Sequence, residues 1–172
     1  MPIIGIDQPD IITIDENLRL RAYDGNYLTG LPWYQNEVVY YNSEGITDKA
    51  KVPDANWVKN MYTCFQNSGK SEMYFIEIKK NGAFIPIGDV ALQEENPPIV
   101  IGVDEYRGRG IGKKVMTAII QRANEIGIKC FYGTRIYDYN IASQKLYESL
   151  GFRCTEIRGN TKIYELSLGV LE

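Results

Sequence analysis

The chain of 172 residues is 44% hydrophobic and 24% charged, and its formal net charge at pH 7 is −3. These values are typical of one globular domain, so we expect residues 1–172 to form a single domain. The acidic balance argues against a nucleic-acid partner, and no apolar run approaches the roughly 18 residues of a membrane span, so we expect no membrane partner either.

The N-terminus lacks a basic region followed by an apolar stretch, so we expect no secretory signal and a cytoplasmic protein. The three cysteines, Cys64, Cys130 and Cys154, lack the spacing of a metal site, and we expect no metal. Cys130 and Cys154 lie in strand-like runs and are interpreted as small core residues.

The N-terminal third shows three patterns. Residues 1–14 are apolar with two prolines, which indicates an extended lead-in or an edge strand. Residues 17–23 alternate between apolar and polar side chains, which predicts a half-buried strand. Asp54 is the expected N-cap of a helix, because the residues after it carry an apolar stripe at helical spacing.

The segment over residues 25–51 has weak periodicity and contains an aromatic cluster that includes Trp33 and Tyr34. These side chains either line a substrate pocket or pack beneath a loop.

Residues 72–79 and 83–93 form the clearest hairpin pattern, with Asn81-Gly82 as its turn. The two-residue period of a strand places Ile85, Ile87, Asp89 and Ala91 on one face. Asp89 is exceptional among these apolar residues. One interpretation is that Asp89 is a functional carboxylate. The other is that it is structural, either hydrogen-bonded or facing outward.

The region over residues 97–127 has the most informative pattern. A short apolar strand, Ile99–Ile101, precedes a glycine-rich basic loop, Arg107–Gly112. The helix that follows has apolar residues at helical spacing and ends near Gly127. Cations at a helix N-terminus are unfavourable by a few tenths of a kcal/mol to ~1 kcal/mol each, unless an anion binds there. The loop is therefore either a phosphate site or a solvated basic turn.

Two nucleotide-binding motifs fit the loop poorly. A P-loop needs Ser or Thr after its lysine, whereas Lys114 follows Lys113. A dinucleotide fingerprint needs a third glycine where Lys113 stands, although Asp138 could act as the ribose-binding acid.

The C-terminal third predicts a strand over residues 129–137, a helix over 140–150, and a hairpin of 152–158 with 161–168 joined at Gly159-Asn160. The order of elements implies a mixed sheet with helices on its faces, of the α/β (α+β) class.

Two motifs carry a family resemblance. The R-x-x-G-x-G pattern of Arg107–Gly112 resembles the acetyl-CoA loop of the GNAT superfamily of N-acetyltransferases. Downstream, Asn140 followed by Tyr147 and then Gly151-Phe152 resembles the second signature of that superfamily. The resemblance implies a mostly antiparallel central sheet flanked by helices on both faces, with acetyl-CoA as co-substrate.

The resemblance assigns the cofactor site residue by residue. The pantetheine arm would contact the central strand, and the pyrophosphate would lie on the loop amides with a lysine beside it. The implied cofactor-binding residues are Val100, Ile101, Gly102, Arg107, Gly108, Arg109, Gly110, Ile111, Gly112, Lys113, Asn140 and Tyr147.

The resemblance also implies catalytic roles for Asn140 and Tyr147, and the chemistry of the reaction requires a base besides them. Asn140 would hydrogen-bond the cofactor or the reacting group, and it is also a helix N-cap by its position. Tyr147 would be the general acid that protonates the leaving thiolate; the alternative is a core tyrosine. The chain has no histidine, so Asp89, Glu77 or water would take the proton from the amine.

One position departs from the ribosomal-protein N-terminal acetyltransferase branch, where a catalytic Glu precedes the Asn on the strand. Arg135 stands there, and we expect it to bind an acceptor carboxylate or to point away from the site.

The expected function is direct acetyl transfer from acetyl-CoA to a primary amine, either a small molecule or a protein N-terminus. Trp33, Tyr34 and Arg135 are the expected substrate-binding residues. The alternatives are a non-catalytic acyl-CoA-binding or sensory module and an NAD- or ATP-binding protein. Association of two copies of the chain into a homodimer is a further alternative.

Overall fold

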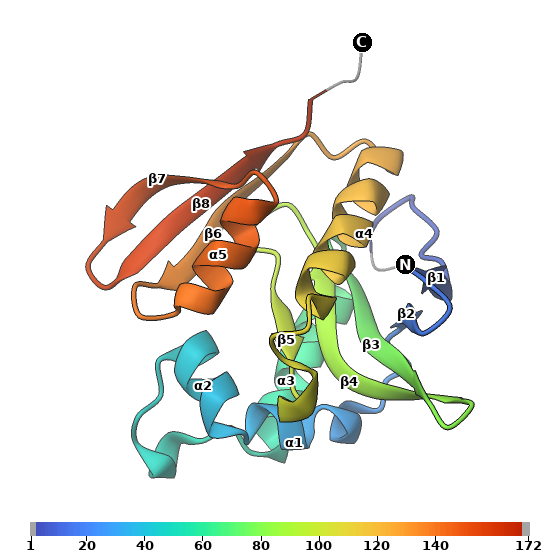
Figure 1. Cartoon of the computed structure of the whole chain (residues 1–172), viewed down its shortest axis with the longest axis horizontal. Helices are drawn as coiled ribbons and strands as arrows, with labels where there is room; N and C mark the ends of the chain where they lie inside the picture. The colour runs from blue at the N-terminus through green and yellow to red at the C-terminus, as the bar shows by residue number, and fades with distance from the viewer. Residues whose placement is uncertain (1–2, 170–172) are drawn as a thin grey trace.

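Two antiparallel sheets form the framework of the molecule, which the computed structural model describes over residues 3–169. The first sheet has the strand order β1-β2-β3-β4-β5 and the second has the order β6-β8-β7. Their bounds are β1 Ile11–Thr13, β2 Leu18–Ala22, β3 Glu72–Lys80, β4 Ala83–Leu92, β5 Ile99–Ile101, β6 Cys130–Tyr137, β7 Arg153–Arg158 and β8 Thr161–Ser167. A parallel bridge between Glu95 and Tyr132 connects the sheets, and beyond it β5 and β6 diverge (Figure 1).

Helices cover both faces of the first sheet. Residues of α4 and α5 pack in the core on one face of the sheet, and residues of α1, α2 and α3 pack in the core on the opposite face. Figure 1 shows α4 and α5 in the upper part of the view and α1 to α3 in the lower part. The helix bounds are η1 Tyr27–Thr29, α1 Leu31–Tyr34, α2 Glu37–Glu44, η2 Lys49–Lys51, α3 Ala55–Asn67, η3 Asp104–Tyr106, α4 Ile111–Glu125 and α5 Ile141–Ser149. The predicted fold class, antiparallel strands flanked by helices on both faces, is confirmed, with the sheet divided in two. Within the described residues, no helix is long and apolar enough to cross a membrane.

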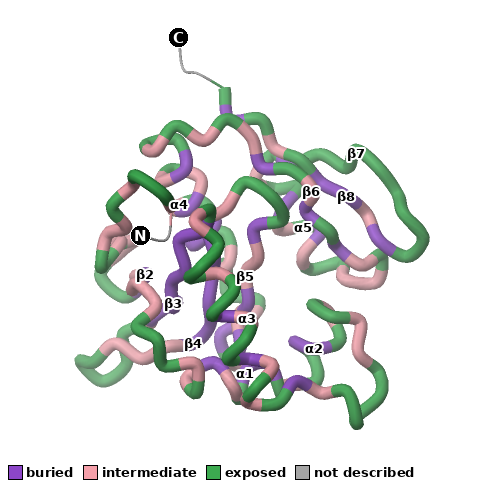
Figure 2. Tube along the Cα trace, turned by 180° about the vertical axis from the view of Figure 1, so that it is seen from behind, coloured by how far each residue is buried: buried purple, intermediate pink, exposed green. Residues whose placement is uncertain are grey.

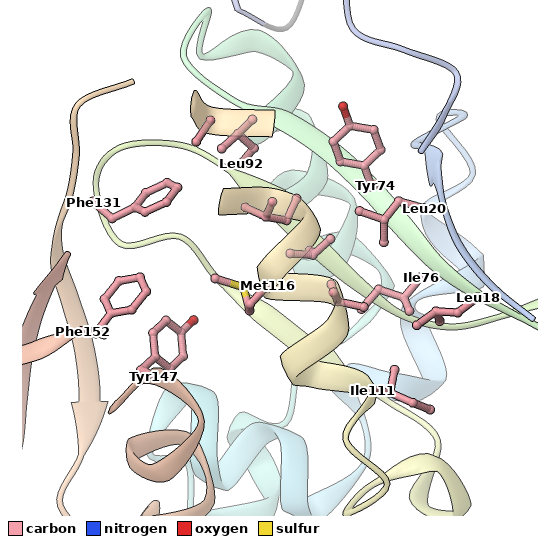
Figure 3. Packing of buried hydrophobic residues seen from close by; sticks show 14 of the residues in the cluster. Leu18, Leu20, Tyr74, Ile76, Leu92, Ile111, Met116, Phe131, Tyr147 and Phe152 are labelled. Atoms are coloured by element: carbon pink, nitrogen blue, oxygen red, sulfur yellow. The ribbon is translucent and has the colours of Figure 1, made fainter. Parts of the chain in front are cut away.

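β3 and β4 lie between two hydrophobic cores. Tyr74 and Ile76 face the core that α4 completes, whereas Met73 and Phe75 face the core under α1 and α3. Figure 2 shows the buried residues gathered along these strands, and Figure 3 shows the α4 core, where Tyr147 stands beside Phe152. The middle of the first sheet is therefore buried on both faces, and the apolar residues of β3 and β4 there alternate between the two cores.

Local signals in the sequence place the element boundaries. The Asp54 side chain accepts a hydrogen bond from the Trp57 amide at 2.8 Å and begins α3, as predicted. Asn81 and Gly82 both have positive φ, as expected of the hairpin turn between β3 and β4. In contrast, α1 and α2 lie in the segment whose weak periodicity left its structure unassigned.

A β-bulge corrects the predicted face of Asp89. Ile76 pairs with Gly88 but Glu77 pairs with Pro86, so Ile87 is an additional residue in β4. Ile87 packs in the α4 core together with Val90, whereas Ala91 lies in the core under α1 and α3. Asp89 is hydrogen-bonded to tyrosines of that second core. The expectation that Ile85 and Ile87 share a face with Asp89 is therefore wrong.

The cysteines also depart from the prediction. Cys154 is exposed, and Cys130 is only partly buried. β7 forms the outer edge of the second sheet, and all of its residues are exposed (Figure 2). The strand-like pattern of residues 152–158 thus predicted the position of β7 correctly. It did not predict burial, because among the described elements no helix packs over this edge strand.

Candidate active site

A cavity of about 240 Å³ lies where β5 and β6 diverge. Its wall includes residues from both sheets and from α1, α2, α3 and α5. The lining residues include Tyr34, Asp89, Thr134, Arg135, Asn140 and Tyr147. The cavity thus brings together the three catalytic residues expected from the sequence and two of the three substrate-binding ones.

One edge of β5 faces this gap. The Pro98 carbonyl accepts from the Ala91 amide at 3.1 Å, and the Gly102 amide donates to the Ile87 carbonyl at 2.8 Å, so these groups face β4. Because the bonds of an antiparallel pair alternate, the main-chain polar groups of Ile99 and Ile101 face away from β4. They are available to an extended ligand, except for the Ile101 carbonyl, which accepts from Arg107 Nε at 2.8 Å.

The loop before α4 has a conformation that leaves its amides free. Gly108 and Gly110 have φ values of 71° and 77°, which side chains rarely tolerate, and Gly110 is the N-cap of α4 without a capping side chain. The Arg107 amide donates to the Asp104 carbonyl, and the Lys114 amide donates to the Gly110 carbonyl. Among the described residues, the amides over residues 108–113 have no hydrogen-bond acceptor, so they are free to donate to an anion at a helix N-terminus.

The four cations of this loop divide into two groups. The Arg107 guanidinium is held internally by the Ile101 carbonyl, by Asp104 and by Asn36, and Lys114 pairs with Asp15 at 2.9 Å. Arg109 and Lys113 are exposed, and Arg109 lies over the Tyr106 ring at 5.8 Å. The second group is therefore the one that can contact a bound anion.

Asn140 and Tyr147 are both presented to the cavity by α5. Asn140 is the N-cap, and its Oδ1 accepts from the Ser143 amide at 3.2 Å. The buried Tyr147 hydroxyl donates to the Pro97 carbonyl at 2.8 Å, and burial raises the pKa of Tyr147 above its ordinary value. Tyr147 therefore keeps its proton near neutral pH, directed at the wall where β5 begins.

Asp89 is held by two tyrosines. The Tyr34 hydroxyl donates to both carboxylate oxygens at 3.0 Å, and the Tyr62 hydroxyl donates to Oδ2 at 2.6 Å. Burial raises the pKa of Asp89 to about 7, although both hydrogen bonds act in the opposite direction. Asp89 can therefore exchange a proton in the physiological range.

The position of Tyr62 depends on close packing around it. Its ring stacks on Tyr23 with centroids 4.6 Å apart. A Cβ at position 30 would lie 2.0 Å from the Tyr62 hydroxyl, so only glycine at that position leaves room for it. The sequence marked Tyr62 as part of the apolar stripe of α3 and gave no sign of this role, which depends on contacts between distant segments.

The remaining predicted residues have varied positions. Trp33 packs against Phe75 and over Gly102 in the core and does not line the cavity. Glu77 lies outside the cavity, held by Arg19 at 2.7 Å and Arg21 at 2.6 Å. Arg135 is exposed at the cavity wall.

Val100 is buried on β5 and lines the cavity. Ile111 is buried at the start of α4, and Gly112 lies close to Leu146 of α5. Thr134 was missed from the sequence, and its buried hydroxyl has no hydrogen-bond partner among the described residues.

Comparisons with known proteins agree with this architecture. A crystal structure of a domain from Methanocaldococcus jannaschii aligns with a TM-score of 0.75 and 25% identity, over 90% of this chain and 100% of that one. The microcin C7 self immunity acetyltransferase MccE, solved with acetyl-CoA and AMP, aligns with a TM-score of 0.68 and 19% identity over 94% and 98% of the two chains.

An acetyltransferase from Salmonella typhimurium that modifies the N-terminal serine of a 50S ribosomal subunit protein aligns with a TM-score of 0.66 and 17% identity, over 92% and 99% of the two chains. At this identity, MccE and the Salmonella enzyme show the fold alone.

Sequence comparison gives the family. An uncharacterized protein of Methanocaldococcus jannaschii is 35% identical over 101 residues, which are 55% of this chain and 21% of that protein. The match thus spans about a fifth of the length of this relative. The sequence profile described as the acetyltransferase (GNAT) family matches residues 43–152, which include the Arg107–Gly112 loop, Asn140 and Tyr147. The chain belongs to the GNAT acetyltransferase family.

Proposed function

We propose that this protein is an N-acetyltransferase that transfers the acetyl group of acetyl-CoA directly to a primary amine. One observation carries the proposal: the free edge of β5 borders the cavity that Asp89 and Tyr147 line, and the free amides over residues 108–113 follow β5 along the chain, at the start of α4. These features match a ligand that has an amide-bearing arm at one end and phosphates at the other.

The two binding surfaces suit different parts of acetyl-CoA. The main-chain groups of Ile99 and Ile101 can pair with the pantetheine amides as a neighbouring strand would, with Val100 and Gly102 bonded to β4 instead. The amides over residues 108–113 can bind the pyrophosphate, with Arg109 and Lys113 beside it.

The cavity residues suit the chemistry of direct transfer. The amine nitrogen attacks the thioester carbonyl, and the sulfur leaves with the electron pair of the broken C–S bond. Tyr147 is the general acid for this sulfur, because burial keeps its hydroxyl protonated. That role requires the hydroxyl to turn from the Pro97 carbonyl toward the sulfur.

Two classes of acceptor are compatible with the fold. The name of MccE describes an acetyltransferase that gives self immunity to microcin C7. The Salmonella enzyme is described as modifying the N-terminal serine of a ribosomal protein. For this chain we propose an amine acceptor that enters beside Arg135, whose exposed guanidinium suits an acceptor carboxylate.

Calorimetric titration with acetyl-CoA tests cofactor binding. Separate titrations with 3′-dephospho-CoA, NAD and ATP show whether the site prefers acetyl-CoA to other nucleotides. We expect micromolar binding of acetyl-CoA and weaker binding of NAD and ATP. The lysine pair supplies a matched control, because Lys113→Ala removes a free cation and Lys114→Ala removes one already paired with Asp15. Tighter binding of NAD or ATP than of acetyl-CoA would overturn the proposal.

Tyr147→Phe separates an enzyme from a non-catalytic acyl-CoA-binding module. We expect the variant to bind acetyl-CoA as the wild type does and to lose about 100-fold in kcat. Retained turnover would show that another group protonates the thiolate. Binding of acetyl-CoA by a wild type that acetylates no amine would favour the sensory alternative.

A further inference from the structure

The Asp89 carboxylate lines the cavity in which an amine would react, together with Tyr34. Asp89 is only 1% exposed, and both of its carboxylate oxygens accept hydrogen bonds from tyrosine hydroxyls. Tyr34 is 5% exposed, whereas Tyr62 is fully buried and is not among the lining residues. Of the two tyrosines bonded to Asp89, Tyr34 is therefore the one that an amine in the cavity can contact.

Within the described residues no cation pairs with Asp89, although Arg135 lines the same cavity. Asp89 forms no salt bridge within the described part of the chain, and its hydrogen-bond donors are Tyr34 of α1 and Tyr62 of α3. The other titratable groups that act on the two tyrosines are Tyr23, stacked on Tyr62, and Glu44 of α2. Nothing in this group holds the carboxylate permanently ionised, as an arginine would.

We propose that Tyr34 is a catalytic proton relay that passes the proton of the acceptor amine to Asp89. The inference rests on the proposed acetyltransferase function and names the base side of that reaction. As the C–N bond forms and the C–S bond breaks, the proton leaving nitrogen goes to Tyr34 Oη, and the hydroxyl proton of Tyr34 goes to Asp89. The sulfur takes its proton from Tyr147, and solvent returns the Asp89 proton to Tyr147 between turnovers.

The acidities fit a relay in which both protons move together. Burial and the neighbouring Asp89 raise the pKa of Tyr34 well above its usual value, so a free tyrosinate would be a poor intermediate. Asp89, with a pKa of about 7, can accept a proton near neutral pH and release it again.

Tyr62 supplies a matched control for Tyr34. Each tyrosine donates to Asp89 through its hydroxyl, and Tyr→Phe removes that hydroxyl in either case. Both variants are expected to raise the pKa of Asp89, because each loses a bond to the carboxylate. Only Tyr34→Phe breaks the path from the cavity.

The experiment measures kcat against pH for the wild type, Tyr34→Phe, Tyr62→Phe and Asp89→Asn, with acetyl-CoA and three amine probes: alaninamide, spermidine and 2,2,2-trifluoroethylamine. With the first two probes we expect about a 100-fold loss of kcat in Tyr34→Phe and Asp89→Asn. In Tyr62→Phe we expect the plateau to stay within about threefold and the pH profile to shift to higher pH. The electron-withdrawing fluorines of trifluoroethylamine make the attacking nitrogen lose its proton more readily, so this probe should be less sensitive to Tyr34→Phe.

Equal effects of Tyr34→Phe and Tyr62→Phe would overturn the relay and leave the proposed function intact. Absence of acetylation of every probe by the wild type would count against the proposed function itself. A proton inventory on the wild type needs no variant: a linear dependence of kcat on the deuterium fraction means that a single proton is in flight, and it would overturn the relay.

Discussion

Two fully buried carboxylates on neighbouring strands are held in opposite ways. Glu72 of β3 accepts two hydrogen bonds from Arg122, at 2.7 and 3.1 Å, and one from Tyr74 at 2.5 Å. Asp89 of β4 accepts only from tyrosine hydroxyls. The first carboxylate has its countercharge built into the fold, and the second does not.

The difference separates a structural carboxylate from one that can exchange protons. Arg122 gives Glu72 a countercharge and ties the α4 helix to β3 at that point. Hydroxyl groups satisfy the hydrogen bonds of Asp89 but do not offset the loss of its hydration, so its pKa rises to about 7. Burial alone therefore does not identify a catalytic carboxylate; the partner does.

The largest expected effect follows from the absence of a countercharge at Asp89. Its pKa is raised from 3.8 to about 7 in the folded chain, so its stabilising contribution is greatest below about pH 4 and is lost as pH rises through 7. The shift corresponds to roughly 4 kcal/mol. Asp89→Asn removes the ionisation, so its stability relative to the wild type should increase between about pH 4 and pH 8, by up to that amount.

Urea unfolding at several pH values measures this difference. Asp54→Asn is the control, because Asn caps a helix as well as Asp and position 54 is exposed. A pH-independent difference between wild type and Asp89→Asn would contradict the comparison.

The second effect tests the carboxylate with a countercharge. Glu72→Gln leaves the Arg122 guanidinium without its buried partner, and we expect a loss of about 3 kcal/mol in the free energy of unfolding. Glu125→Gln is the matched control, since Glu125 lies 3.9 Å from Arg122 but is exposed, and its loss should cost well under about 1 kcal/mol. Folded Glu72→Gln should keep its specific activity; a loss of activity at unchanged stability would reverse the roles assigned to the two carboxylates.

The smallest effect extends the comparison to the cations before α4. Arg107→Ala removes internal bonds to the Ile101 carbonyl and to Asp104, and should lower stability by about 1 to 2 kcal/mol. Arg109→Ala should leave stability unchanged and weaken acetyl-CoA binding roughly fivefold. Thermal unfolding and calorimetry on both variants measure these effects, and identical behaviour of the two would contradict the division.

Much of the fold could be predicted because its signals are local. Asp54 begins α3, and Asn81-Gly82 turns the β3–β4 hairpin, through bonds and φ angles set by adjacent residues. The apolar residues of α4 recur at helical spacing, so the sequence alone predicts which face of this helix is buried. The loop from Arg107 to Gly112 and the position of Asn140 at the start of α5 could also be predicted, because each is a short motif at a helix terminus.

The rest of the site depends on contacts that no local pattern contains. The face of Asp89 is set by the extra residue Ile87, which a strict two-residue period cannot reveal. Tyr34 and Tyr62 meet Asp89 from helices 55 and 27 residues away in sequence. Trp33 was expected at the substrate as part of an aromatic cluster, and Arg107 at the phosphates by the family resemblance. In the structure Trp33 packs in the core and the Arg107 side chain bonds to internal partners, contacts that local sequence does not indicate.

The divergence of β5 from β6 has a consequence for hydrogen exchange. The amides of Ile99 and Ile101 lie within the molecule yet lack a neighbouring strand on the cavity side, and those over residues 108–113 have no acceptor among the described residues. These amides should exchange quickly in the free protein and slowly once an extended, phosphate-bearing ligand pairs with them, while those between β3 and β4 stay protected throughout. Exchange rates at β5 and before α4 would thus report occupancy of the site without knowledge of the acceptor.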